Sequence, residues 1–353
     1  MKTFAGMSSQ RLEELLAAVG RLRIGVAGDF FLDKYLDIDG SLAEQSVETG
    51  KTAHQVVAIR HSPGAAGTVV CNLAALGTGA IWAIGLTGED GESYDLRKDL
   101  TALGCNTDHL HGDPQRLTPT YLKPRERSDP SLAGEHERYD TKNRTPTSAA
   151  TVRKIVQSLD ALLPQLDALI IADQVDEEDC GVVTAAVRSA VGDRAKQHPR
   201  VVFWADSRRR IRQFRHVVIK PNQFEAVGKE NPLPGDEVGL SELQAAIAAL
   251  RAATAAPLCV TRGAAGMVVS DPEVMLVPGV QLSGPIDPTG AGDSATAGAV
   301  LALAAGAELA EAALVGNLVA SITVEQLATT GTARPDQLPP RLKLWQTQQT
   351  ERT

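Results

Sequence analysis

Short apolar runs recur along the chain, and the segments between them carry apolar residues at helical spacing. Runs of this length favour buried strands, and the intervening periodicity favours helices. Strands are expected at residues 23–27, 80–86, 168–172, 201–205, 216–219, 258–261 and 267–269. Helices are expected at residues 9–20, 69–76, 94–103, 152–163, 180–191, 240–253, 291–305 and 309–327. Alternating strands and helices indicate an α/β fold, with a mostly parallel sheet covered by helices on both faces.

Two polar segments, residues 34–60 and 111–140, interrupt this alternation. They contain scattered β-branched residues, and one strand is expected at residues 120–123. We therefore expect both segments to form a lid on a single domain that covers residues 1–340. Residues 341–353 are polar, and we expect a frayed C-terminal tail after Pro340.

Composition narrows the class of protein. Apolar residues make up 43% of the 353 residues and aromatic residues only 4%, so the core must be mostly aliphatic and rich in Ala. A net charge of −8 argues against a nucleic-acid or anionic-membrane partner. The four cysteines are scattered without zinc spacing, which indicates reduced thiols. With neither a signal-peptide run nor a membrane-spanning segment in the sequence, a cytoplasmic protein is expected.

The stretch from Asp287 to Asp293, DPTGAGD, is a glycine-rich turn with a carboxylate at each end. A helix of unusually small residues begins directly behind it. Gly290 and Gly292 permit backbone conformations that other residues resist, and amides at a helix start bind anions such as phosphate. Because like charges repel, Asp293 beside a phosphate makes sense as a base that takes a proton from an attacking hydroxyl. The turn therefore indicates phosphoryl transfer to an alcohol.

A second polar pair, Asn222 and Glu225, follows the expected strand at residues 216–219. Three residues apart at a helix start, the two side chains share one face. Near the carboxyl edge of the sheet they could hold Mg²⁺ through waters. Alternatively, Asn222 caps the helix and Glu225 favours its dipole, and the spacing alone favours this second interpretation.

Three further features are ambiguous when each is taken alone. Residues 261–266 form a tight turn between two strands, which is either a plain hairpin or a ligand-binding turn. Asp33 follows the first strand and is either a ligand for sugar hydroxyls or a solvated loop acid. The arginines between residues 208 and 215 are interpreted as a solvated helix face.

Taken together and in this order, the motifs resemble the ribokinase-type carbohydrate kinase family, also called the phosphofructokinase-B type. Residues 287–293 look like the family's D-[TP]-T-G-A-G-D signature, residues 222–225 like its N-x-x-E motif, and residues 261–266 like its T-x-G-x-x-G nucleotide turn. The resemblance runs from about residue 23 to about residue 337. Within the family, residues 28–35 and the Thr120-x-x-Lys123-x-Arg125 pattern are similar to the heptose-7-phosphate kinase branch.

The resemblance implies a doubly wound domain with a small β lid that often mediates homodimerisation. It also implies ATP and Mg²⁺ as cofactors, often with K⁺, and a sugar or sugar-phosphate substrate. By matching position, Asp293 would be the catalytic base, and the backbone amides of Gly290, Ala291 and Gly292 would form the anion hole. Glu225 and Asn222 would organise Mg²⁺, Asp287 and Thr289 would lie by the monovalent cation, and the nucleotide would contact Thr261, Gly263, Gly266 and Asn317.

On the acceptor side, the resemblance implies that Asp33 binds sugar hydroxyls and that the sugar lies near Gly64. Lys123 and Arg125 could grip a phosphate already on the sugar, or they are exposed lid charges. The branch usually carries P-G-G-A-A-N, whereas residues 63–68 here read PGAAGT. Ala65 narrows the backbone approach, and Thr68 lacks the paired donor and acceptor of an amide. The acceptor therefore stays open between a heptose phosphate, a hexose phosphate and a nucleoside, and a non-catalytic sensor is a further alternative.

Overall fold

The computed structural model describes residues 1–129, 134–233, 235–327 and 330–351. At its centre is a sheet with the strand order β13-β12-β11-β2-β7-β8, in which every neighbouring pair is parallel. Its strands are β2 (Arg23–Gly28), β7 (Ala80–Thr87), β8 (Cys105–Gly112), β11 (Ala168–Asp173), β12 (Val202–Ser207) and β13 (Val218–Ile219). Because the strands are parallel, the loops after β2, β11, β12 and β13 all emerge at one edge, where ligands bind in open α/β sheets.

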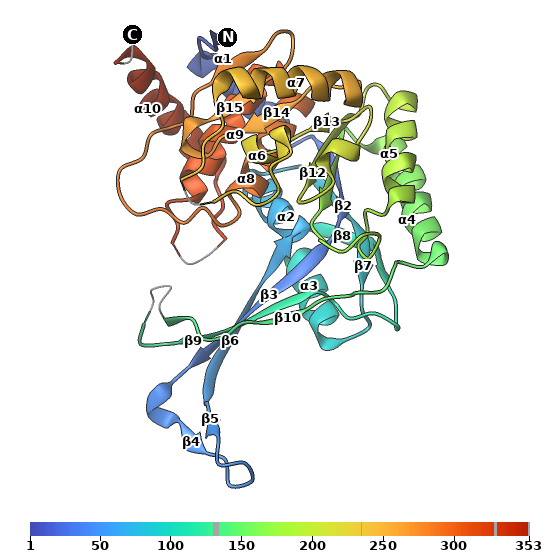
Figure 1. Ribbon diagram of the computed structural model, residues 1–353, viewed down its shortest axis with the longest axis vertical. Helices are drawn as coiled ribbons and strands as arrows, with labels where there is room; N and C mark the ends of the chain where they lie inside the picture. The colour runs from blue at the N-terminus through green and yellow to red at the C-terminus, as the bar shows by residue number, and fades with distance from the viewer. Residues whose placement is uncertain (130–133, 234, 328–329, 352–353) are drawn as a thin grey trace.

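Helices cover both faces of this sheet (Figure 1). They are α1 (Ser9–Val19), α2 (Ala66–Ala75), α3 (Gly91–Ala102), α4 (Ala149–Leu162), α5 (Ala185–Gln197), α6 (Gln223–Val227), α7 (Leu240–Thr254), α8 (Ala291–Ala304), α9 (Leu309–Thr323) and α10 (Leu338–Thr350). Side chains of β11 alternate between two cores: Ile170 joins residues of α1, α2, α8 and α9, whereas Leu169 and Ile171 join residues of α4, α5 and α7. This alternation follows from the two-residue period of a strand and confirms the expected α/β class.

A smaller sheet, in the order β1-β16-β15-β14, adjoins the central one. Its strands are β1 (Lys2–Thr3), β14 (Cys259–Thr261), β15 (Met267–Val269) and β16 (Met275–Val277). A backbone bridge between Ile219 and Leu258 joins the two sheets beside β13. The loops after β13 and β14 are thereby held next to each other.

The expected lid is a separate sheet in the order β10-β9-β3-β6. It consists of β3 (Phe30–Ile38), β6 (Val56–Ala65), β9 (Thr120–Glu126) and β10 (Tyr139–Thr141), with a terminal hairpin of β4 (Glu44–Gln45) and β5 (Thr52–Ala53). Figure 1 shows β3, β6 and β9 running out from the helical body, with β4 and β5 at the far tip. The first lid strand begins at Phe30, four residues before the expected boundary, because β3 continues almost directly from β2.

The expectation of a frayed C-terminal tail is wrong. Residues 338–350 form α10, whose Trp345 side chain is only 1% exposed and donates a hydrogen bond of 2.8 Å from Nε1 to the Pro278 carbonyl. Leu338, Leu342 and Trp345 are the buried side chains of this helix, and polar residues fill most of its other positions. The apolar pattern also missed β8, an edge strand of mostly polar residues. Within the described part of the chain, no helix is long and apolar enough to cross a membrane.

Candidate active site

Helix α8 begins at the glycine-rich turn, and its first residues are arranged to receive an anion. Gly290 is the N-cap at φ 75° and ψ 3°, a left-handed conformation that glycine adopts without a steric penalty. The Asp287 carboxylate accepts the Thr289 amide at 3.0 Å and so holds the turn in shape. The Ala291 amide donates to the Pro288 carbonyl at 3.1 Å, so this member of the expected anion hole is engaged within the turn. For the Gly292 amide, the described residues provide no acceptor.

Asp293 lies in the first turn of α8 and is half-buried. Burial raises the pKa of its carboxyl to about 7, and the nearby Asp206 carboxylate raises it further, while Lys220 and Arg208 act in the opposite direction. A carboxyl group with a pKa near 7 exchanges its proton readily at neutral pH. This is the property that a general base requires.

A buried ion pair adjoins this carboxyl. Lys220, directly after β13, places its ammonium 2.8 Å from the Asp206 carboxylate at the end of β12. A Cβ placed on Gly292 would lie 3.5 Å from the same ammonium, so the cation faces the start of α8. Burial acts to lower the pKa of Lys220, but Asp206, Asp293 and Glu225 outweigh it and raise the pKa. The sequence analysis gave neither residue a role, although Asp206 lies near the end of one strand and Lys220 follows another at the ligand edge.

Asn222 and Glu225 form a capping box at the start of α6, as the spacing alone favoured. The Asn222 amide oxygen accepts the amides of Phe224 and Glu225, each at 2.9 Å, and the Glu225 carboxylate accepts the Asn222 amide at 2.7 Å. Burial raises the pKa of Glu225 to about 6. With its oxygen engaged twice, Asn222 offers a ligand its NH₂ group, which suits a phosphate oxygen better than a metal ion. One carboxylate oxygen of Glu225 has the chemistry for Mg²⁺ or its bound water.

The residues expected to hold a nucleotide line one cavity of about 300 Å³. Thr261, Gly263, Gly266 and Asn317 share this cavity with Ala291 and Gly292 from the start of α8. Gly266, at φ 91°, could not carry a Cβ, which would lie 2.2 Å from the Val277 carbonyl. Apolar side chains complete the walls: Val280, Leu282, Ile286 and Val324. A cavity of this size, lined by apolar side chains and by the first residues of α8, fits a planar base joined to phosphates.

The acceptor-side residues gather on the lid. The Lys123 ammonium lies 2.7 Å from the Asp33 carboxylate and 3.4 Å from the Tyr35 hydroxyl. Burial acts to lower the pKa of Lys123, but Asp33 outweighs it and raises the pKa. Gly64 lies on the neighbouring strand β6 in register with Phe31, and a Cβ on it would approach an Asp33 oxygen to 2.5 Å. Arg125, further along β9, is buried.

The two groups of candidate residues approach each other where α2 and α8 begin. A Cβ placed on Gly290 would lie 3.3 Å from Thr68 Cγ2, so the altered residue at position 68 borders the phosphate turn. Ala65, the N-cap of α2, has φ 54° and ψ −118°, which is strained for any residue with a Cβ. Both departures from the family pattern therefore lie at the junction between the two halves of the site.

The basic run is not the helix face that had been expected, although Arg208, Arg209, Arg212 and Arg215 are exposed to solvent as predicted. Arg208 to Arg210 form a turn directly after β12, at the ligand edge of the sheet. Arg210 is buried and bonds Asp173 through Nε and Nη2, at 3.2 and 2.8 Å. Strand β12 ends directly before this run and so places its first three arginines beside the site. The expectation rested only on helical periodicity, which does not show where a preceding strand ends.

Comparisons with known proteins match this geometry. The model of the pfkB family of carbohydrate kinases covers residues 35–336. The bifunctional protein HldE of Caulobacter vibrioides is 31% identical over 329 residues, which are 90% of this chain and 64% of the relative. HldE of Stutzerimonas stutzeri is 30% identical over 88% of this chain and 62% of the relative. The chain thus spans less than two thirds of the length of either relative.

Solved structures share the fold at low sequence identity. Phosphofructokinase-2 from Escherichia coli in complex with fructose-6-phosphate aligns with a TM-score of 0.66 at 17% identity, covering 91% of this chain and 98% of that one. Ribokinase from Cryptococcus neoformans in complex with ADP aligns with a TM-score of 0.59 at 19% identity, covering 92% and 99%. With a family model that matches most of its length, this chain belongs to the pfkB family of carbohydrate kinases.

Proposed function

We propose that this carbohydrate kinase transfers the γ-phosphoryl group of ATP to a hydroxyl of a sugar phosphate, with a heptose 7-phosphate as the first acceptor to test. The observation that carries the proposal is Asp293: a carboxyl with a pKa of about 7 at the start of α8, beside the buried Lys220 ammonium. The motif resemblance to the heptose-7-phosphate kinase branch supports the choice of acceptor. A nucleoside or a hexose phosphate remains the alternative acceptor in the same family.

In the proposed reaction, Asp293 accepts the proton of the acceptor hydroxyl as that oxygen attacks the γ-phosphorus and the bond to the β-phosphate oxygen breaks. The Gly292 amide, which has no acceptor among the described residues, and the Lys220 ammonium, which faces the start of α8, would stabilise negative charge on the phosphoryl group. The catalytic contribution of these groups is positioning and electrostatic stabilisation. Asn222 would donate its amide NH₂ to a phosphate oxygen.

We assign the Mg²⁺ of the reaction to the side of the cleft that carries Glu225. When bound there, the ion would neutralise phosphate charge. Asp287 and Thr289 are retained as the monovalent-cation position, because the Asp287 carboxylate shapes the turn beside the phosphate site. Turnover in KCl compared with NaCl tests this position, and equal rates in both salts would remove it from the proposal.

A kinase assay across heptose 7-phosphate, fructose phosphates, ribose and nucleosides tests the proposed function. Phosphorylation of a sugar phosphate with the highest kcat/KM is the expected result. The altered residues Ala65 and Thr68 motivate one rival, a sensor that binds a sugar phosphate or nucleotide without turnover. Binding of ATP and a sugar phosphate with transfer to none of these acceptors would favour that sensor.

We also propose a cytoplasmic location, where ATP and reduced thiols coexist.

A homodimer through the lid is a further proposal. The lid leaves Val56, Val57, Ile59 and Tyr139 exposed along β6 and β10. Light scattering is expected to give a dimer for the protein and a monomer for Ile59→Asp. Leu344→Asp, at an exposed leucine of α10, is the control that should stay dimeric, and a monomeric parent protein would contradict the proposal.

A further inference from the structure

Two lid cations were candidates for binding a phosphate on the acceptor. In the structure, one is engaged in an ion pair and the other is buried. Lys123 is paired with Asp33 at 2.7 Å, and the two side chains are only 15% and 11% exposed. Arg125 is buried on the same strand. A phosphate that approached Lys123 would have to compete with a short, enclosed ion pair. Cations with open surface beside the site are therefore better placed to bind it.

Three such cations converge on one carboxylate at the ligand edge of the sheet. Asp176 lies 3.2 Å from Arg209 Nε, 3.7 Å from Lys142 Nζ and 3.8 Å from Arg208 Nη1. We call Lys142, Arg208 and Arg209 the cation cluster. Only the Arg209 contact is short enough for a hydrogen bond, and the described residues give the Lys142 and Arg208 side chains no other. Arg208 and Arg209 are 48% and 47% exposed, so their donors can reach a ligand.

Two buried charges fix the loop that carries Asp176. The Asp29 carboxylate accepts the amides of Gln174, Val175 and Val182 at 2.8, 3.1 and 2.7 Å. Arg210 donates to the carbonyl of Asp176 at 3.0 Å, in addition to its pair with Asp173. Burying charges to hold a surface loop is costly unless each is fully bonded, as here. The cation cluster therefore stands on a preorganised support.

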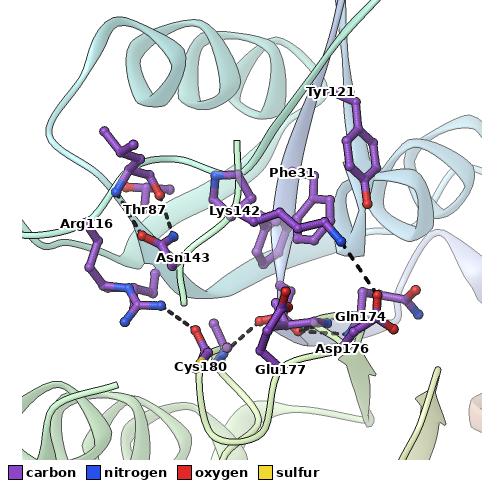
Figure 2. A pocket seen from close by; sticks show the side chains of 18 residues that line it. Phe31, Thr87, Arg116, Tyr121, Lys142, Asn143, Gln174, Asp176, Glu177 and Cys180 are labelled. Carbon is purple, nitrogen blue, oxygen red and sulfur yellow. Dashed lines mark hydrogen bonds and ion pairs between the residues drawn. The ribbon is translucent and has the colours of Figure 1, made fainter. Parts of the chain in front are cut away.

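The cation cluster lies between the candidate base and the lid. Arg208 lies two residues after Asp206, whose carboxylate pairs with Lys220 beside the start of α8, so this guanidinium is near the phosphoryl end. At the other side, Lys142 and Asp176 line a cavity together with Phe31 and Tyr121 (Figure 2). Tyr121 pairs in register with Asp33, and its ring contacts Phe31, so these rings share the lid face of Asp33.

The hydrogen-bond donors of the cation cluster suit a phosphate group. All three cations lie within 4 Å of Asp176, but only Arg209 Nε is close enough to donate a hydrogen bond to it. Arg210 is paired separately with Asp173. The remaining Arg and Lys donors of the cation cluster match the geometry of phosphate oxygens.

We propose that the cation cluster of Lys142, Arg208 and Arg209 binds a phosphate group that the acceptor already carries, which makes sugar phosphates the substrate class. This inference rests on the proposed function. It places the acceptor along the cleft, with its reacting hydroxyl at Asp293, its other hydroxyls near Asp33 and its phosphate over Asp176. The small cavity beneath Phe31 and Tyr121 bounds the far end of that path.

The test compares kcat/KM for phosphorylated and unphosphorylated forms of one sugar, using heptose 7-phosphate against the free heptose and fructose 6-phosphate against fructose. In Arg209→Gln and Lys142→Gln, the ratio of the two values is expected to fall roughly tenfold, since each variant removes one charge-assisted bond to phosphate. The KM for ATP is expected to stay constant. Arg334→Gln, at an exposed arginine paired with Asp336, is the charge-matched control.

Other outcomes would overturn the inference. An unchanged ratio, or an equal loss on both forms of the sugar, would mean that the cation cluster only supports the loop. A rise confined to the KM for ATP would assign it to the nucleotide. If the parent protein phosphorylates no sugar, the proposed function fails separately, and calorimetry with fructose 6-phosphate still tests the cation cluster: equal affinity for the parent and Arg209→Gln would refute it.

Discussion

Helices α8 and α2 both begin at the cleft with a residue at positive φ, but they use different residues. Gly290 opens α8 at φ 75°, and Ala65 opens α2 at φ 54°. Neither start has a side-chain cap among the described residues. Glycine fits such a position freely, whereas the Cβ of alanine makes the conformation of Ala65 unfavourable.

The difference separates what is common to the family from what is particular to this chain. The α8 side keeps the glycine turn, Asp293 and the nucleotide cavity, so its geometry satisfies general requirements of phosphoryl transfer. The α2 side carries Ala65 and Thr68 in place of the residues expected from the resemblance, and its backbone is strained at Ala65. Strain that persists at a site is a sign of functional constraint there. Substitutions on the two sides should therefore have different consequences.

The largest effect is expected on the α8 side from Asp293→Asn, which keeps the shape of the side chain and removes the base. Turnover should fall by about 10²- to 10⁴-fold, because proton removal from the hydroxyl loses its acceptor. ATP affinity, measured by calorimetry, should change little. If the variant retains full turnover in a coupled assay, Asp293 is not the base. The difference in function between the α8 side and the α2 side would then be contradicted as well.

A smaller effect is expected from Lys220→Met, with a characteristic pH dependence. Asp293 must be ionised to act, so kcat/KM should fall as the pH drops through about 7. Lys220 lowers the pKa of Asp293, so its removal should move this acidic limb to higher pH and reduce turnover roughly 10- to 100-fold through lost charge stabilisation.

The double variant Lys220→Met with Asp206→Asn controls for the unpaired Asp206 that the single variant leaves behind. Because Asp206 raises the pKa of Asp293 and Lys220 lowers it, removing both should return the acidic limb towards its original pH. Turnover should remain low, since the cation is still missing. Restored turnover in the double variant would mean that Lys220 only neutralises Asp206 and does not stabilise charge in the reaction.

Gly290→Ala should create at the start of α8 the kind of backbone strain that Ala65 causes at the start of α2, because both are positive-φ positions. The new Cβ would adopt φ 75° and lie 3.0 Å from Thr330 Cγ2 and 3.3 Å from Thr68 Cγ2, which should lower the free energy of unfolding by about 1–2 kcal/mol. Urea denaturation measures this loss. Gly306→Ala is the matched control, because Gly306 has φ 90° with open space around it. A larger loss at Gly290 than at Gly306 would report the contacts with Thr330 and Thr68, and an equal loss would mean that these contacts cost nothing.

The smallest effect is expected from Ala65→Gly, which removes the strain from α2. Relief of the left-handed conformation outweighs the added freedom of the unfolded chain, so stability should rise by about 0.5–1 kcal/mol. Ala255→Gly, also at φ 54° but at the end of α7, should give a similar gain. Only Ala65→Gly should also change the acceptor KM. If the acceptor KM is unchanged in both variants, the backbone strain at Ala65 has no influence on which acceptor the protein binds.

Much of the fold could be predicted because it follows from local pattern. Apolar runs such as residues 168–172 mark buried parallel strands, and the glycines at 290 and 292 mark the turn before a helix. The capping box of Asn222 and Glu225 was foreseen from spacing alone. Edge strand β8 and helix α10 were not, because polar residues dominate both and their order comes from neighbouring elements.

The sequence by itself determined the fold class, the phosphoryl-transfer turn and the identity of Asp293 as a candidate base, since backbone conformation and burial periodicity are encoded over a few residues. Only the tertiary structure paired Lys220 with Asp206, tied Lys123 to Asp33 and gathered Lys142, Arg208 and Arg209 around Asp176. These contacts join residues up to 90 positions apart. Charges interact through space, so their partners depend on how the strands are ordered in the sheets, and local pattern does not contain that order.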